Sequence, residues 1–235
     1  MSRILKSTCE RYGLNININT LHVDFETSVT NAVKELFPAT QIKGCCFHLG
    51  QAWWRKIQEL GHKDSGSDIG NWLRLIFGLP SIPAEEMDDC FVFTLMANAP
   101  DDERISQFSD YLLRSFITMD SCFPPIMWTF SPEDSKRTTN GCESFHRHFG
   151  DQFISPHPNI FDWLEKIKEE QTKIALKIKA AMKPRKQATN EEAESRKRQK
   201  IYVYKSGELT QYDFFKNSGT CDLYIILSTI LVSNF

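Results

Sequence analysis

The sequence lacks an apolar run long enough to cross a membrane, because its longest one, at residues 223–232, is short and interrupted. No long apolar stretch follows the first six residues, so we expect neither a secretory signal nor a membrane partner. The seven cysteines are scattered and odd in number, which does not suit a disulfide framework. We therefore expect reduced thiols in the cytoplasm or the nucleus, and no secretion.

An excess of charge of one sign is also missing. A net charge of −2 gives no overall attraction to nucleic acid, so any such attraction has to be local. The proportions that are present, 41% hydrophobic and 25% charged residues, are typical of a soluble globular protein. With 235 residues, the chain can form one sizeable core or one domain with an extension.

Residues 1–67 carry the pattern of an α/β unit. A short helix is expected over residues 1–13, ended by Gly13. Strands at residues 21–23 and 41–47 then alternate with helices near residues 29–37 and 51–60. This order predicts parallel strands, and chemistry in such sheets collects at the carboxyl ends of strands, where Asp24 lies.

The strand pattern fades after residue 67. Residues 68–123 read as an all-helical block, and residues 124–182 contain a helix that opens near Asn140 and a long amphipathic helix from 160 to 182. Residues 183–200 are basic and almost free of apolar side chains, which indicates a linker. Residues 201–235 show no clear period, and the sequence assigns them no role.

Two acids in this arrangement suit a metal. Asp24 would lie at a strand end and Glu143 one turn into a helix, and paired carboxylates hold the divalent cations that act on phosphodiesters. The alternative is that Asp24 caps the following helix and Glu143 pairs with Arg147. Spacing alone leaves both interpretations open.

Two cysteine–histidine pairs form the second candidate site. Cys45-x-x-His48 has half the spacing of a zinc site, and Cys142-x-x-x-His146 would supply the other half if both pairs converged. The alternative is a set of buried thiols and of histidines that cap helices or pack.

Together these segments resemble the catalytic core of Mutator-like element (MULE) transposases over roughly residues 1–175. The resemblance rests on four motifs in order: Asp24-Phe25-Glu26, the run from Ile42 to Gln51 with Cys45-x-x-His48, Arg137-Thr138-Thr139-Asn140-x-x-Glu143-x-x-His146, and His157-Pro158-Asn159-Ile160. It implies a ribonuclease H-like core with a helical insertion between the second and third acids of an Asp-Asp-Glu triad.

The resemblance also implies roles. Asp24 matches the second acid, Glu143 the third, and His146 the histidine after it, while Cys45 and His48 match the family's Cys-x-x-His signature. It implies Mg²⁺ or Mn²⁺ as cofactor, DNA strand cleavage and transfer as reaction, DNA as partner, and the nucleus as location. The residues expected to contact DNA are Arg137, Asn140, Lys183, Arg185, Lys186, Arg196, Lys197 and Arg198.

Nothing before Asp24 matches the first acid of the family. We therefore expect an α/β fold, mostly helical overall: an N-terminally truncated ribonuclease H-like core with an incomplete sheet, an all-helical insertion, and little or no nuclease activity. A homo-oligomer or residues 201–235 would close the open sheet. The alternative is a domesticated, non-catalytic module that binds DNA or a protein.

Overall fold

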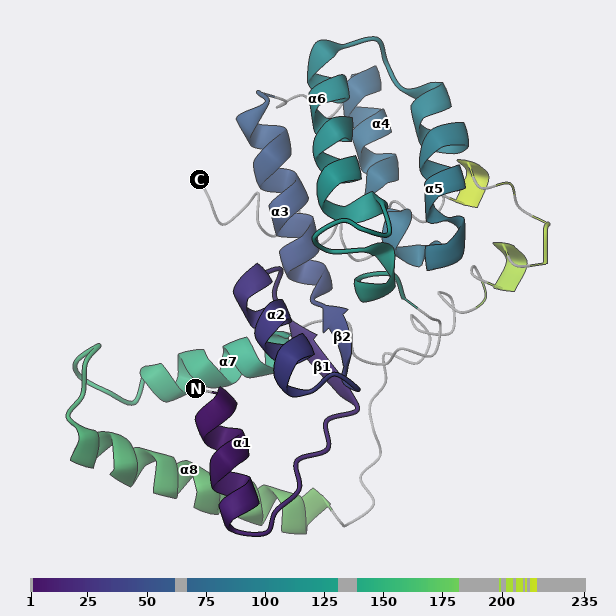
Figure 1. The fold of residues 1–235 in the computed structure, drawn as a ribbon. Helices are drawn as coiled ribbons and strands as arrows, with labels where there is room; N and C mark the ends of the chain where they lie inside the picture. Colours follow the sequence, from purple (N-terminus) through teal and green to yellow (C-terminus); the bar gives the residue numbers. More distant parts are fainter. Residues whose placement is uncertain are drawn as a thin grey trace. The chain divides into compact units, whose positions relative to one another are not determined.

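The computed structural model describes residues 2–61, 67–130 and 139–181, and short pieces at 199, 202–204, 206–208, 210 and 212–214. The chain divides into two compact units, each described here by itself (Figure 1). Unit 1 comprises Met1–Thr139 and Lys197–Phe235, and unit 2 comprises Asn140–Arg196.

Unit 1 begins with the predicted alternation of helices and strands. Helix α1 is followed by a turn in which Gly13 adopts a positive φ of 69°, a conformation that glycine adopts without steric cost. Two side-chain hydrogen bonds join α1 to α2. Arg3 donates to the Glu35 carboxylate, and Lys6 donates to the Leu36 carbonyl. The elements of this part are α1 (Ser2–Arg11), β1 (Thr20–Val23), α2 (Thr27–Leu36), β2 (Gln41–Gly44) and α3 (Cys46–Glu59).

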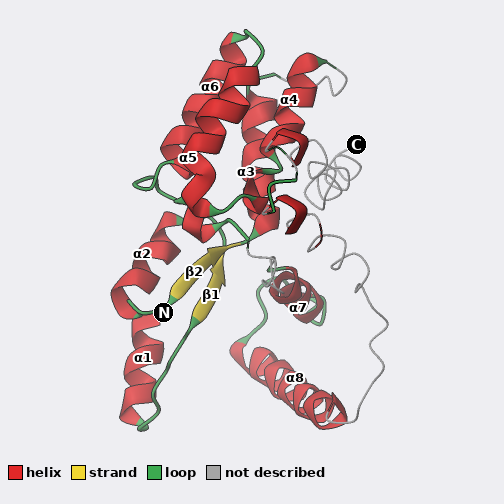
Figure 2. Cartoon of the chain, turned by 90° about the vertical axis from the view of Figure 1, so that its right-hand side faces the viewer, coloured by secondary structure: helices red, strands yellow, loops and turns green. Residues whose placement is uncertain are grey.

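Strands β1 and β2 pair in parallel, as predicted. The register aligns Thr20 with Gln41 and Val23 with Gly44, so both strands end at the same edge. They form a two-stranded sheet within the part of the chain that the structure describes, and helices make up most of the rest (Figure 2). The expected α/β class with mostly helical content is thereby confirmed.

The prediction that the second strand runs to residue 47 was wrong. Strand β2 ends at Gly44, and Cys45 occupies the N-cap position of α3 with extended backbone angles (φ −73°, ψ 122°). The helical spacing of the buried residues Leu49, Trp53 and Ile57 explains the early start, because it places them on one face that packs into the core. His48 therefore lies in the first turn of a helix.

The block after residue 67 is helical, as predicted. Ser67 caps α4 by accepting a bond from the Gly70 amide at 3.1 Å, and Asp102 caps α6 by accepting one from the Arg104 amide at 2.8 Å. Its helices are α4 (Asp68–Ile76), α5 (Met87–Asp89) and α6 (Glu103–Leu112), with π-helical turns at Cys90–Leu95 and Leu113–Ile117 and 3₁₀ turns at Leu79–Ser81, Ala84–Glu86, Met96–Asn98 and Pro125–Met127.

Helix α3 and this block share one hydrophobic core. In both views α3, α4, α5 and α6 lie alongside one another (Figures 1 and 2). Trp53 of α3 makes an edge-to-face contact with Trp128 at 5.7 Å between ring centroids, and the indole N–H of Trp128 donates to the Phe123 carbonyl. The largest fully buried side chains of this core are Trp53, Trp128, Phe91, Phe108, Phe116 and Phe214.

The last of these, Phe214, belongs to the C-terminal stretch for which the sequence predicted no structure. Its side chain is 1% exposed, and its ring lies 4.7 Å from that of Tyr204, centroid to centroid. The Tyr204 hydroxyl donates to the Glu86 carboxylate. Phe214 is therefore part of the core of unit 1, and Tyr204 packs against that core.

Unit 2 contains α7 (Asn140–Gly150) and α8 (Ile160–Ala181), close to their predicted bounds. Asn159 caps α8, because its side-chain oxygen accepts hydrogen bonds from the amides of Phe161 and Asp162 at 3.0 Å. Phe149 and Trp163 join the two helices through an edge-to-face ring contact. None of the described helices is both long and apolar enough to span a bilayer.

Replacing Phe214 by alanine is expected to lower the free energy of unfolding of unit 1 by about 3 kcal/mol, the cost of deleting a buried phenylalanine. Chemical denaturation followed by tryptophan fluorescence measures it. Tyr212→Ala is the matched control, because that side chain is 41% exposed two residues away. Equal, small effects of both substitutions would show that the stretch does not stabilise the core.

Candidate metal site

The parallel pairing of β1 and β2 places two chemically active residues side by side. Asp24 follows β1 directly and Cys45 follows β2. The Cys45 amide donates to the Val23 carbonyl at 2.9 Å, which extends the strand pairing by one step. The backbone itself therefore fixes the two residues at one edge of the sheet.

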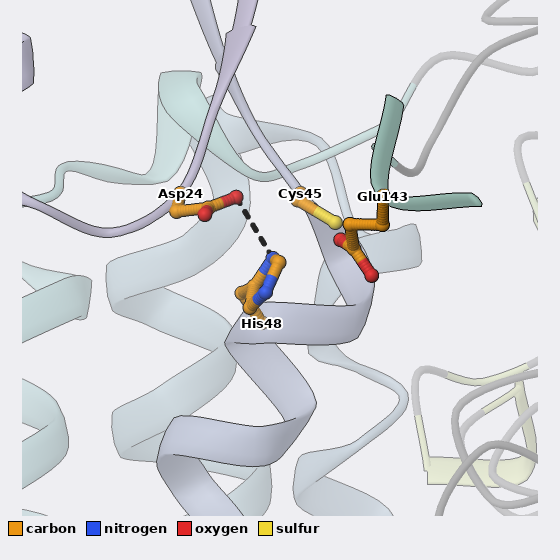
Figure 3. A group of neighbouring side chains, drawn as sticks. All are labelled: Asp24, Cys45, His48 and Glu143. Carbon is orange, nitrogen blue, oxygen red and sulfur yellow. Dashed lines mark ion pairs between the residues drawn. The ribbon is translucent and has the colours of Figure 1, made fainter. Parts of the chain in front are cut away.

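His48 joins them from the first turn of α3. Its Nδ1 atom lies 2.9 Å from Oδ1 of Asp24 (Figure 3). The ring of Phe47 also contacts the imidazole edge-to-face, with 5.4 Å between the ring centroids. One ligand atom each from Asp24, Cys45 and His48 lies within 4.8 Å of the other two, which brings three potential metal donors together.

The three side chains differ in their access to water. Cys45 is fully buried, the His48 side chain is 23% exposed, and that of Asp24 is 49% exposed. The cluster is thus closed at the sulfur and open at the carboxylate. An ion can reach such a site from solvent and still lose part of its water shell at the protein side.

Thr139 supports the sulfur from a distant part of the chain. Its backbone N–H and its hydroxyl each donate to Sγ of Cys45 at 3.3 Å. The two hydrogen bonds fix the position of the sulfur atom at the N-cap of α3. Thr139 is the last residue before α7, so the chain returns to the edge of the sheet just before that helix begins.

Sequence reasoning had placed the site residues in two separate constellations. It paired Asp24 with Glu143, and Cys45 and His48 with Cys142 and His146. The geometry of unit 1 adds a link between the two constellations, because it groups Asp24 with Cys45 and His48. The alternative in which Asp24 caps the following helix was wrong, because the N-cap residue of α2 is Glu26. The sequence did not predict the contact between Thr139 and Cys45, although Thr139 belongs to the motif that precedes the helix.

The remaining predicted residues lie in unit 2 or outside the described residues. Glu143, Cys142 and His146 are exposed residues of α7, which belongs to unit 2. The roles of all three stay predictions. Asn140 opens α7, but its side chain is not among those described. The other residues expected to contact DNA lie outside the described residues: Arg137, Lys183, Arg185, Lys186, Arg196, Lys197 and Arg198.

Comparison of the chain with known protein families, with curated proteins and with solved structures found no match.

Another deeply buried thiol of unit 1, Cys90, has a different environment. Burial, and next the charge of Glu86, raise the pKa of the Cys90 thiol to about 12. A pKa raised this far keeps the group protonated at neutral pH, so Cys90 offers no thiolate to a metal or an electrophile.

Thiol labelling of the folded protein checks this difference. A maleimide at pH 7 to 9, below the pKa of about 12 of Cys90, should modify the exposed Cys122 and leave Cys90 unmodified. In denaturant Cys90 should react as well. Equal labelling of both cysteines in the folded state, located by peptide mass spectrometry, would contradict the burial of Cys90.

Gly44, the last residue of β2, lies close to the ring of Phe25. A Cβ atom at Gly44 would lie 2.5 Å from Cζ of the Phe25 ring, far inside van der Waals contact. Phe25 in turn packs edge-on against Phe116 and Phe123. Gly44 and Phe25 adjoin Cys45 and Asp24, so crowding them would disturb the site itself.

Gly44→Ala is therefore expected to cost about 1–3 kcal/mol in the free energy of unfolding, as overpacking does. In a Phe25→Leu background the same substitution should cost clearly less, because the smaller side chain leaves room. A double-mutant cycle by chemical denaturation measures the coupling. Additive effects would mean that the two residues do not compete for space.

Proposed function

We propose that this chain is a core domain of the MULE transposase type, with a ribonuclease H-like ancestry and an ancestral reaction of DNA strand cleavage and transfer. The observation that carries the proposal is the contact of Thr139 with Cys45. It supports a return of the chain, after a long helical block, to the strand edge that carries Asp24. The resemblance to the family implies such a return just before the third acid.

Chain continuity supports Glu143 as the partner acid of Asp24. Glu143 lies four residues after Thr139, inside a helix that starts at Asn140. With a rise of about 1.5 Å per residue, four residues of helix span roughly 6 Å. This short separation along the chain supports the role of third acid that the resemblance implies for Glu143.

The donors of unit 1 do not fit the pair of Mg²⁺ ions that the family implies. Mg²⁺ takes oxygen ligands in a near-octahedral arrangement, whereas two of the three clustered donors here are a sulfur and a nitrogen. Residues 2–23, which precede Asp24, form α1, a loop and β1 and place no further acid at a strand end. The proposal is therefore one of ancestry, with phosphodiester cleavage by this chain alone slow or absent.

This mismatch favours a second candidate function, a domesticated module that binds DNA or a protein without cleaving it. A nicking assay on supercoiled plasmid with Mg²⁺ or Mn²⁺ separates the two. Nicking that disappears in both Asp24→Asn and Glu143→Gln would show a surviving enzyme. If nicking is absent and the iron-cleavage test described next shows the shared acid site, the result supports the binding module.

Iron-mediated backbone cleavage tests the shared acid site without requiring activity. Fe²⁺ bound in place of Mg²⁺ or Mn²⁺, with ascorbate and peroxide, cuts the chain near its ligands. We expect cuts close to both Asp24 and Glu143, suppressed by excess Mn²⁺ and lost at both positions in Asp24→Asn.

Glu169→Gln is the matched control, because Glu169 is an acid of α8 within the same unit as Glu143. It should leave both cuts unchanged. Cutting near Asp24 with none near Glu143 would show that the two acids do not share a site, and the proposed ancestry would lose its chemical basis.

A further inference from the structure

We infer that Asp24, Cys45 and His48 form a zinc site with three protein ligands and an open fourth position. The inference rests on the geometry of unit 1 alone and does not depend on the transposase ancestry. It also differs from the sequence-based zinc hypothesis, because the third ligand is Asp24 and neither Cys142 nor His146 is required.

The donor set selects the metal. A thiolate, an imidazole and a carboxylate together are ligands that Zn²⁺ takes in proteins, whereas Mg²⁺ and Ca²⁺ avoid sulfur. Sites with three protein ligands commonly hold water or a substrate in the fourth position. The exposed side of the cluster, at Asp24, leaves room for such a fourth ligand.

The distances fit with small adjustments. Ligand atoms of a tetrahedral zinc site with bonds of 2.0–2.3 Å lie about 3.3–3.8 Å from one another. The three donor atoms here lie within 4.8 Å of one another, and the Asp24–His48 contact is 2.9 Å. Side-chain rotations that move atoms by about 1 Å would therefore complete the geometry.

The surroundings of Cys45 are those of a metal-bound sulfur. Metal ligands are oriented by hydrogen bonds from a second layer of residues, and mutation of that layer weakens metal binding. Thr139 supplies two such bonds to Sγ, one from its backbone and one from its hydroxyl. A zinc ion would therefore tie together the ends of β1 and β2, the first turn of α3 and the residue before α7.

Cobalt substitution tests the site in the full-length chain. Co²⁺ bound through a thiolate gives a sulfur-to-metal charge-transfer absorption, and Zn²⁺ displaces it. We expect one equivalent of Co²⁺ to produce this band, Cys45→Ser to abolish it, and Asp24→Asn and His48→Gln to weaken Zn²⁺ affinity about 10-fold or more. Thr139→Val, which removes one donor to the sulfur, should weaken it by roughly 10-fold.

Cys142→Ser and His146→Gln are the matched controls. Both change exposed donors of α7, and neither should alter the band or the affinity. Circular dichroism shows whether each variant is folded, and the partly exposed positions Asp24 and His48 keep the test valid if Cys45→Ser misfolds. Absence of the band in the wild type, or its persistence in folded Cys45→Ser, would overturn the inference.

The two proposals fail separately. Iron cleavage near both acids without a cobalt–thiolate band would retain the acid site and remove the zinc site. A band that depends on Cys45, without iron cleavage near Glu143, would retain the zinc site and remove the proposed ancestry. An effect of Glu143→Gln on Zn²⁺ affinity would identify Glu143 as the fourth ligand and support both.

Discussion

The parallel pairing of β1 and β2 is the constraint on which the site depends. Because the strands run in the same direction in a fixed register, their carboxyl ends meet, and Asp24 and Cys45 become neighbours through backbone hydrogen bonds. His48 follows because α3 starts directly after Cys45 and places it one turn along the helix. Three potential ligands thus come from one short strand–helix–strand–helix segment.

The helical block keeps this segment in place. Leu49, Trp53 and Ile57 of α3 are buried in the same core as α4 and α6, so the helix that carries His48 is held along its whole buried face. Phe25, next to Asp24, packs against Phe116 and Phe123 of that block. A site supported by a rigid core loses little entropy when an ion binds, which favours affinity.

Much of this arrangement could be predicted from the sequence. The periodicity of apolar residues predicted the two parallel strands, the helical block and both helices of unit 2. It could do so because the period reflects which face of an element is buried. The start of α3 was placed too late, since Cys45, Cys46 and Phe47 are apolar and follow the strand without a break. Phe214 was missed, because a single aromatic residue reaching the core from a separate piece of chain leaves no period.

The grouping of the site residues was the harder part. Spacing favoured the familiar cysteine–histidine pairs, and it could not show that Asp24, remote in sequence from His48, would lie 2.9 Å from it. Only the strand register joins the acid to the thiol. The sequence patterns therefore contained the ligands, and the pairing of the backbone decided which of them meet.

The most direct test of the metal centre is X-ray absorption at the zinc edge of the zinc-loaded protein. The account predicts one sulfur neighbour at about 2.3 Å and the remaining nitrogen and oxygen neighbours at about 2.0–2.1 Å. A shell without sulfur, or one with two or more sulfurs, would contradict a site made of Asp24, Cys45 and His48.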